Sequence, residues 1–281
     1  MSEQPVRGKL VDVKAIFFSK NPTLARWIPG FIFRYLKRIV HEDFMNDFLN
    51  RQGHKKNIEF LDAVIEEFKV SIETVGEKEL PKEGRYIFAC NHPLGGFDGI
   101  VLMKLLSNHY PEIKYLVNDI LMNLKPISEL FIPINKHGSQ GAIAVQQIEE
   151  AYSSDIQILT CPSGIVSRKF NGQVMDPPWQ KSFIQKAVKH QRDIIPVHFS
   201  GKNTNFFYNL SNLRKFLGIK ANIEMLYLVD ETFKHTGEHV VVTFGKPIPY
   251  TIFDRSRTPA QWAKYVKEQA YGLAGITEVP V

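Results

Sequence analysis

The sequence predicts an α/β protein with a mainly parallel sheet flanked by helices, preceded by an N-terminal helical segment. From about residue 70 onward, short apolar runs of strand character alternate with helical stretches, and before that point the apolar positions follow the helical period. Alternation of strands with helices favours parallel pairing, because each helix carries the chain back to the same end of the sheet. We therefore expect an N-terminal segment at residues 1–69 and an α/β domain at residues 70–281.

Composition sets the outer limits of this prediction. The 281 residues are 44% hydrophobic and 23% charged, which is typical of a globular protein and excludes a disordered or collagen-like chain. The two cysteines, Cys90 and Cys161, exclude a disulfide framework and favour a reducing compartment. No apolar run approaches the ~18–20 residues of a membrane-spanning helix, and we see no secretory signal. We expect a cytoplasmic protein, or one on the cytoplasmic face of a membrane.

The positive charge is concentrated at the N-terminus. Residues 1–57 contain 11 Lys/Arg and 5 Asp/Glu, whereas residues 58–281 contain 24 of each. A basic segment on an otherwise neutral protein is typical of contact with an anionic surface, either lipid or nucleic acid. A solvated charged surface with no partner explains the same distribution equally well.

The N-terminal segment is predicted to be helical over residues 9–50. Between Phe31 and Leu49 the apolar side chains fall close to the helical period, and basic residues occupy the opposite face. The aromatic residues that flank this basic face are Trp27, Phe31, Phe33 and Tyr35. Such a helix suits the headgroup layer of a membrane, although a helix packed on the protein with its charges outward has the same pattern. Ile58–Phe68 is predicted to be another amphipathic helix.

The α/β domain is expected to contain seven strands and five helices. The strands are predicted at Arg85–Cys90, Ile113–Val117, Phe131–Ile134, Ile156–Cys161, Ile194–Phe199, Ile223–Leu228 and His239–Phe244. The helices are predicted at Gly99–Ser107, Ser139–Ser153, Gln180–Gln191, Thr204–Leu217 and Pro259–Ala274. Ligands of parallel sheets bind at the carboxyl ends of the strands, so the residues after each strand are the first candidates for a functional site.

A histidine and an aspartate follow the first predicted strand, in the run NHPLGGFD from Asn91 to Asp98. The Pro/Gly turn can fold the chain so that the Asp98 carboxylate meets one imidazole nitrogen of His92, which leaves the other nitrogen as a base. Gly95 and Gly96 leave backbone N–H groups uncovered near a helix start, where an oxyanion could rest. Asp98 is also a good helix N-cap, and that structural role alone would explain it.

Cations follow two further predicted strands, Ile156–Cys161 and Phe131–Ile134. Arg168 and Lys169 lie side by side in the loop after the first of these, where they can hold a phosphate or a carboxylate. Lys136 is a lone cation directly after the second. A solvated loop and an ordinary surface lysine explain these residues when each is taken alone.

Together these residues resemble the motifs of the lysophospholipid acyltransferases, the family that includes bacterial 1-acylglycerol-3-phosphate acyltransferase. The first motif of that family is Asn-His, then four residues, then Asp. It is similar to Asn91, His92 and Asp98, although five residues separate His92 from Asp98 in this chain. The second motif is an apolar strand that ends in a basic residue, and Phe131–Lys136 looks like it.

Two further motifs occur in the same order. The third motif of the family usually reads Pro-Glu-Gly-Thr-Arg, and Pro162–Gly164 is similar to it, with Ser163 in place of the glutamate and the basic residue delayed to Arg168. The fourth motif, an apolar strand that carries a proline, looks like Ile194–Val197. The resemblance covers about residues 70–250.

The resemblance implies a reaction as well as a fold. It implies transfer of a fatty acyl group from a thioester of acyl carrier protein or coenzyme A to the hydroxyl of a single-chain lipid, with no bound cofactor and no metal. His92 would be the general base and Asp98 would orient it. The residues that the resemblance assigns to the acceptor lipid are Arg168, Lys169, Lys136, Ser163 and Gly164.

The run NHPLGG with its wider spacing is similar to a bacterial branch described as glycerol acyltransferase or hemolysin-like. Some members of that branch resemble the O-acyltransferases that complete glycine or ornithine lipids. The expected acceptor is therefore lysophosphatidic acid or a lyso-aminolipid, such as lyso-glycine or lyso-ornithine lipid. Since both substrates would be lipids, we expect a peripheral protein on the inner face of the cell membrane, with an anionic lipid surface and not nucleic acid as its partner. A second aromatic and basic stretch, at residues 205–216, either extends this contact or packs as a helix on the protein.

Two other functions compete with this one. A lipid esterase would use Ser163 as nucleophile and His92 as base, although Ser163 lacks the flanking Gly-x-Ser-x-Gly pattern. A non-catalytic lipid-binding protein would explain the basic N-terminus but not the polar residues after three strands. The histidines show no spacing typical of a zinc site.

Overall fold

The computed structural model describes residues 9–20, 22–134 and 140–276. Seven strands form the main sheet: β1 Ser71–Val75, β2 Tyr86–Cys90, β3 Ile113–Val117, β4 Phe131–Pro133, β5 Gln157–Thr160, β8 Asp193–Phe199 and β9 His239–Phe244. Two short strands, β6 Arg168–Phe170 and β7 Gln173–Met175, pair as a separate antiparallel hairpin. Six of the seven predicted strands are confirmed; β1, β6 and β7 were not predicted, because each has at most five residues and mixes polar with apolar side chains.

The helices occupy the segments between the strands and the N-terminus. The α-helices are α1 Val13–Lys20, α2 Pro22–Trp27, α3 Gly30–Ile39, α4 Glu42–Gln52, α5 Asn57–Phe68, α6 Gly96–Ser107, α7 Gln140–Ser153, α8 Ser182–His190, α9 Asn205–Phe216, α10 Leu228–Lys234 and α11 Pro259–Gly272. The 3₁₀-helices are η1 Glu77–Glu79, η2 Asp119–Asn123, η3 Lys125–Leu130, η4 Ile223–Tyr227 and η5 Tyr250–Ile252. The five helices predicted for the α/β domain are confirmed as α6, α7, α8, α9 and α11.

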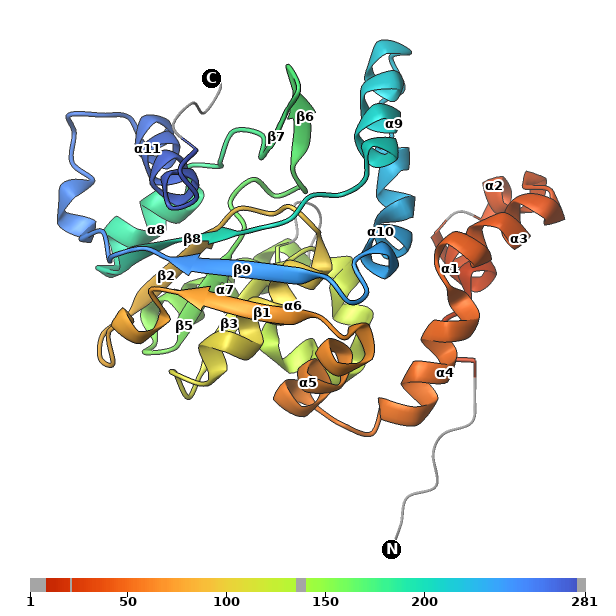
Figure 1. Ribbon diagram of the computed structural model, residues 1–281, viewed down its shortest axis with the longest axis horizontal. Coiled ribbons are helices and arrows are strands. Elements are labelled where there is room, and N and C mark those ends of the chain that lie inside the picture. Colours follow the sequence, from red (N-terminus) through yellow and green to blue (C-terminus); the bar gives the residue numbers. More distant parts are fainter. Residues whose placement is uncertain (1–8, 21, 135–139, 277–281) are drawn as a thin grey trace, which may run out of the picture.

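The strands of the main sheet follow the order β1-β9-β8-β2-β5-β3-β4. Every neighbouring pair is parallel except β8 and β9, which are antiparallel. Figure 1 shows helices around this sheet, with α1–α4 set to one side of it and α9 projecting beyond it. The predicted mainly parallel sheet flanked by helices is confirmed.

The central strand β2 shows why the sheet is covered on both faces. All five of its residues are buried, as expected for a parallel strand with helices on both sides. Phe88 and Cys90 belong to the core under α5 and α6, whereas Ile87 and Ala89 belong to the core under α8 and α11. The continuous apolar run therefore orients alternate side chains into two separate cores. His92, which follows β2, leaves the sheet at its carboxyl edge.

The N-terminal segment is helical as predicted, in four short helices instead of one long one. Pro29 precedes α3 in an extended conformation, and His41 ends the α3 region with a left-handed φ of 52°. The helices α1 and α3 share a small apolar core formed by Val13, Phe33, Leu36 and Ile39. In contrast, α5 packs its apolar side into the main core. None of the described helices combines the length and hydrophobicity needed to cross a bilayer.

The strand predicted at Ile223–Leu228 is wrong. This stretch is the 3₁₀-helix η4, which leads directly into α10. Glu224 points into the protein, where it pairs with two buried arginines, and Met225 and Leu228 pack on a small core beside α9. A run of only six apolar-rich residues has the same periodicity in a buried helix as in a strand, so the pattern did not discriminate between them.

Candidate active site

A histidine–aspartate pair lies at the carboxyl edge of the sheet, directly after β2. The Nδ1 atom of His92 is 2.9 Å from Oδ2 of Asp98. The Asp98 side chain is fully buried, whereas 16% of the His92 side chain is exposed. A carboxylate only accepts hydrogen bonds, so it holds the proton on Nδ1 and leaves Nε2 as the nitrogen that can accept a proton.

Asp98 has a structural role as well, although the N-cap of α6 is Gly95 and not Asp98 as expected. It is the third residue of α6, and its carboxylate accepts hydrogen bonds from the backbone N–H groups of Leu94 (3.1 Å) and Gly95 (3.2 Å). The longer turn between His92 and Asp98 closes because Gly95 adopts a φ of 88°, a conformation that residues with a Cβ rarely adopt. The same carboxylate therefore caps the helix and orients the imidazole.

The backbone at His92 is fixed from two sides. The buried Asp176 carboxylate accepts hydrogen bonds from the backbone N–H of His92 (3.1 Å) and from the hydroxyl of Ser167 (2.6 Å). The backbone N–H of Ser167 in turn donates to the carbonyl of His92 at 2.8 Å. On the other side, the Asn91 side chain exchanges two hydrogen bonds with the backbone of Phe199 in β8. These bonds hold the imidazole in one place on the rigid sheet.

The surroundings of His92 favour its protonated form. Burial disfavours the charged imidazolium, but contact with the Cys161 sulfur and with the Asp98 carboxylate outweighs burial and raises the pKa of His92 well above its ordinary value. Burial also raises the pKa of Asp98, although its hydrogen bond to His92 opposes this. A raised basicity is useful to a group that must remove a proton from an alcohol.

Cys161 is a member of the site that sequence reasoning missed. It directly follows β5, and its proximity to His92 helps to raise the histidine pKa. Its sulfur also lies 3.3 Å from the hydroxyl oxygen of the buried Tyr115. Cys161 could have been identified from the sequence, because it ends a predicted strand. Asp176 could not, because it follows β7, a strand that was not predicted.

The structure corrects the role expected of Arg168. Its side chain is 1% exposed, and one of its Nη atoms lies 3.0 Å from Glu224 Oε1. The other Nη atom donates to the carbonyls of Val166 and Ser167. A guanidinium enclosed in this way does not meet a ligand, so the prediction that Arg168 clamps the acceptor headgroup is wrong for this structure. Arg168 directly follows Ser167 and therefore lies next to the site, but its side chain points away into the protein.

The other residues assigned to the acceptor differ in their accessibility. Lys169 is half-buried, and its Nζ donates to Asn205 at 3.0 Å. Ser163 is buried and its hydroxyl donates to the carbonyl of Ile165 at 2.8 Å, so it shows no hydrogen bond to the imidazole within the described residues. Gly164 is exposed in the turn after β5 with a φ of 68°. Lys136 lies outside the described residues.

The two glycines expected to form an oxyanion site are not equivalent. The N–H of Gly95 is already donated to Asp98, so it is not free to bind an oxyanion and that prediction needs correction. Gly96 is exposed at the first position of α6, and a Cβ added there would meet no heavy atom within 4 Å. Its role in binding an oxyanion stays a prediction.

A small apolar cavity of about 40 Å³ adjoins the start of α6. It is lined by Gly96, Gly99, Tyr115 and a group of aliphatic and aromatic side chains from α5, α6, η2, η3 and β4. Its lining is almost entirely apolar, and its volume holds only a few water-sized groups. A larger hollow of about 520 Å³ lies around Tyr86 and Asp193, at the amino ends of β2 and β8 and therefore at the opposite edge of the sheet from His92.

The fold and the dyad define a class of protein: an α/β protein with a carboxylate-oriented histidine at the carboxyl edge of its sheet. The chain belongs to the acyltransferase family, whose model matches residues 15–278. The predicted family resemblance and the predicted acyltransferase activity are both confirmed by this match.

Curated relatives extend along nearly the whole chain. The chain is 49% identical over 265 residues to the lyso-glycine lipid O-acyltransferase of Bacteroides thetaiotaomicron, covering 94% of this chain and 97% of the relative. It is 44% identical over 265 residues to the lyso-glycine lipid O-acyltransferase of Phocaeicola vulgatus, covering 94% and 95%. Among solved structures, the crystal structure of the 1-acyl-sn-glycerophosphate (LPA) acyltransferase PlsC from Thermotoga maritima is similar, with 17% identity and a TM-score of 0.47, covering 96% of this chain and all 100% of that one.

Proposed function

We propose that this protein is an O-acyltransferase that transfers a fatty acyl group to the hydroxyl of lyso-glycine lipid. The observation that carries the proposal is the identity of 49% and 44%, over 94% of the chain, to two relatives that are both lyso-glycine lipid O-acyltransferases. The geometry supports the proposal, because a histidine whose Nδ1 is bonded to a buried carboxylate is suited to accept an alcohol proton at Nε2.

In the proposed mechanism, Nε2 of His92 accepts the proton of the acceptor hydroxyl as the oxygen attacks the carbonyl carbon of an acyl thioester. The new C–O ester bond forms and the C–S bond breaks. The thiolate of acyl carrier protein or coenzyme A then takes the proton from the imidazolium. Asp98 stabilises the imidazolium while it exists. A thiolate is a good leaving group, so the reaction needs no enzyme nucleophile.

The apolar cavity beside α6 is the candidate position for the end of a fatty chain. Gly96 and Gly99, which line it, flank Asp98 in sequence, so the cavity adjoins the dyad. Because it holds only a few water-sized groups, a longer chain needs the aliphatic lining of α5, η2 and η3 to move apart.

The residues beside the dyad agree with an acceptor that has no phosphate group. A lysophosphatidic acid headgroup carries a doubly charged phosphate, which is usually bound by accessible arginines. In this structure Arg168 is buried against Glu224, and the serine at position 163 replaces a glutamate of the family motif. These departures favour an acceptor without a phosphate. The enzyme acts at the inner membrane surface in this proposal, because its acceptor is a lipid.

A competition between acceptors tests the proposal. The purified enzyme is given an acyl-coenzyme A or acyl carrier protein thioester, together with lyso-glycine lipid, lyso-ornithine lipid or lysophosphatidic acid. We expect kcat/KM for lyso-glycine lipid to exceed that for the other two at least tenfold, which corresponds to about 1.4 kcal/mol of discrimination. Equal or better use of lysophosphatidic acid would overturn the assignment.

The same assay separates transfer from hydrolysis. An esterase would release free fatty acid from a product lipid, and a thioesterase would release it from the donor without any acceptor. The variant Ser163→Ala is expected to retain full transfer activity, because the Ser163 hydroxyl is bonded to a backbone carbonyl and not to His92. Loss of activity in that variant would support the esterase mechanism instead.

A further inference from the structure

Exposed aromatic side chains are confined to two separate segments of the described chain. The five large aromatic side chains with the most exposed surface are Trp27, Phe31, Tyr35, Phe206 and Phe216. Trp27 is 82% exposed and Phe216 is 86% exposed. Isolated exposed apolar residues are ordinary, but several of them gathered at two sites indicate surfaces that meet another apolar phase.

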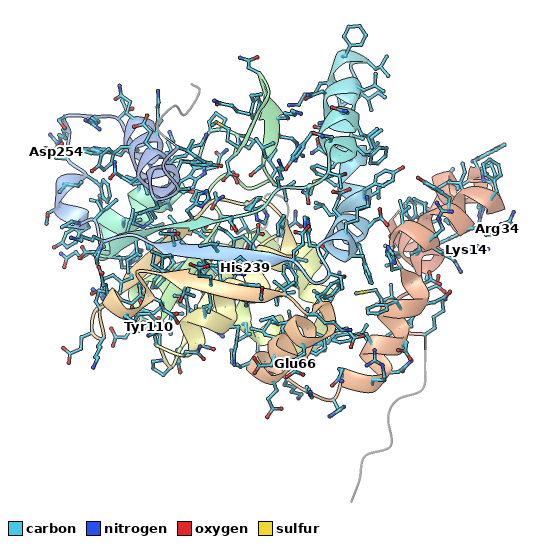
Figure 2. All side chains as sticks on the ribbon, in the orientation of Figure 1. Lys14, Arg34, Glu66, Tyr110, His239 and Asp254 are labelled. Carbon is cyan, nitrogen blue, oxygen red and sulfur yellow. The ribbon has the colours of Figure 1, made fainter. Side chains whose placement is uncertain are left out.

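The same two segments lack acidic residues. Residues 13–41 contain six Lys/Arg and no Asp or Glu, and residues 200–223 contain four Lys/Arg and no Asp or Glu. Figure 2 labels Lys14 and Arg34 on the N-terminal helices, on the side of these helices away from the main sheet. Although Lys37 and Arg214 pair with Glu42 and Glu224 outside these segments, the segments themselves mix aromatic and apolar side chains with an excess of cations. Such a mixture is complementary to an anionic lipid surface, which offers both a hydrophobic layer and negative headgroups.

Helix α9 has an inner and an outer side. On the inner side Phe207 and Tyr208 are buried near its start, and Arg214 near its end pairs with Glu224. The outer side is exposed, and we define it as the α9 tip: Leu213, Lys215, Phe216, Leu217, Ile219 and Lys220. These inner contacts hold α9 on the protein, so its exposed apolar side chains are not needed for its packing.

The α9 tip is not an isolated projection. The α9–η4–α10 region contacts the N-terminal helices through Tyr227, whose ring meets Phe206 of α9 at 5.0 Å and whose hydroxyl lies 2.8 Å from that of Tyr35 in α3. His41 stacks on Phe233 nearby, with ring centroids 3.8 Å apart. Figure 1 shows α9 and the helices α1–α3 projecting on the same side of the molecule. The two basic aromatic segments therefore form one connected surface.

This surface is also attached to the active-site turn. Leu228, at the start of α10, lies against Gly95, because a Cβ added to that glycine would be 3.4 Å from the leucine methyl carbons. The Asn203 side chain, just before α9, donates to the carbonyl of Pro93 at 3.1 Å. The turn between His92 and Asp98 therefore lies at the base of α9, and the α9 tip lies at the outer end of the same 12-residue helix.

We propose that the α9 tip is a second lipid-contact site, which acts with the N-terminal helices to orient the enzyme on an anionic membrane. The inference rests on the proposed function, since a lipid acceptor must reach His92 from the membrane. Two attachment sites hold an enzyme in one orientation, whereas the N-terminal helices alone would leave it free to rotate about them. The α9 tip would thus determine which face of the protein meets the lipid.

Vesicle binding and two acceptor formats test the proposal. The double variant Phe216→Ser/Leu217→Ser is compared with the wild type and with the control Val75→Ser/Val188→Ser, which changes two exposed valines on β1 and α8. Sedimentation uses vesicles of phosphatidylcholine with roughly 30% phosphatidylglycerol. Activity is measured with lyso-glycine lipid in those vesicles and with a short-chain, water-soluble analogue. Circular dichroism and thermal unfolding verify that each variant is folded.

We expect the α9-tip variant to bind the vesicles at least about tenfold more weakly, to lose turnover of the vesicle acceptor in proportion, and to retain turnover of the soluble analogue. Unchanged vesicle binding would overturn the inference. If binding is unchanged but KM for an acyl carrier protein thioester rises, the α9 tip contacts that acidic protein and not lipid. Absence of transfer by the wild type in both formats would overturn the proposed function, whereas vesicle binding would still decide the inference.

Discussion

At the scale of single residues, the proposed mechanism depends on one imidazole. His92 is the only group in the described part of the site that is both partly exposed and bonded to a buried carboxylate. We expect His92→Ala to reduce kcat by about 10²–10⁴-fold or more, which is the usual contribution of a general base. Steady-state assays measure this, and His109→Ala, which removes a surface histidine paired with Glu77, is the matched control. A folded His92→Ala protein with normal turnover would contradict the mechanism.

The pH profile reports the environment of the dyad. His92 must lose its proton before it can accept one from the substrate, and its surroundings raise its pKa. The active fraction therefore grows as the pH rises. We expect the acid limb of kcat/KM to lie above about 6.5, the ordinary pKa of histidine. An acid limb below that value would show that burial dominates over the two favourable contacts.

Cys161 is expected to set part of that pH dependence. Its sulfur favours the imidazolium of His92, so Cys161→Ala removes a contact that raises the histidine pKa. The acid limb should move to lower pH, while the variant stays folded. Ser163→Ala, two residues further along, is the control and should leave the limb in place. An unmoved limb in Cys161→Ala would mean that Asp98 alone raises the pKa of His92.

At the scale of elements, a buried ion cluster joins α9 to the rest of the protein. Glu224 accepts from Arg168 in β6 and from Arg214 in α9, and all three side chains are buried. Glu224→Gln leaves two arginines without a counter-charge, and we expect a loss of about 3–5 kcal/mol in the free energy of unfolding. Urea denaturation measures it. Glu268→Gln, which breaks an exposed pair with Lys264, should change little.

The start of α6 is expected to tolerate a methyl group at one glycine and not at another. A Cβ at Gly99 would lie 2.2 Å from the ring of Tyr115, whose hydroxyl contacts Cys161, whereas a Cβ at Gly96 would meet nothing within 4 Å. We expect Gly99→Ala to destabilise the protein by about 1–3 kcal/mol through overpacking. Thermal unfolding of both variants measures this. Equal stability would mean that the ring of Tyr115 moves aside freely.

At the scale of the whole molecule, charge placement predicts how the protein meets a membrane. Arg34 and Arg38 are exposed on α3. Near an anionic surface each basic residue contributes about 1 kcal/mol, so Arg34→Ala/Arg38→Ala should weaken vesicle binding roughly 30-fold at low salt. The control Lys181→Ala/Lys246→Ala removes equal charge from exposed positions outside the two basic aromatic segments. Equal binding of both double variants would show that net charge, and not its position, controls attachment.

Much of this molecule was determined by the sequence itself. Strands such as β2 and β9 were predicted because a parallel or central strand needs a continuous apolar run, and such runs are visible in the letters. The dyad was predicted because His92, a Pro/Gly turn and Asp98 follow such a strand, and a short turn restricts how far apart its ends can lie. Local chemistry of this kind needs few long-range contacts.

The tertiary structure alone decided which charged groups are free. Arg168 looked accessible in the sequence, but Glu224, 56 residues further along, buries it. Cys161 and Tyr115 joined the site because β5 and β3 are neighbours in the sheet. The strand expected at Ile223–Leu228 is instead a 3₁₀-helix, in which Glu224 pairs with two buried arginines. Burial and pairing depend on residues distant in the chain, and no local pattern records which of them will meet.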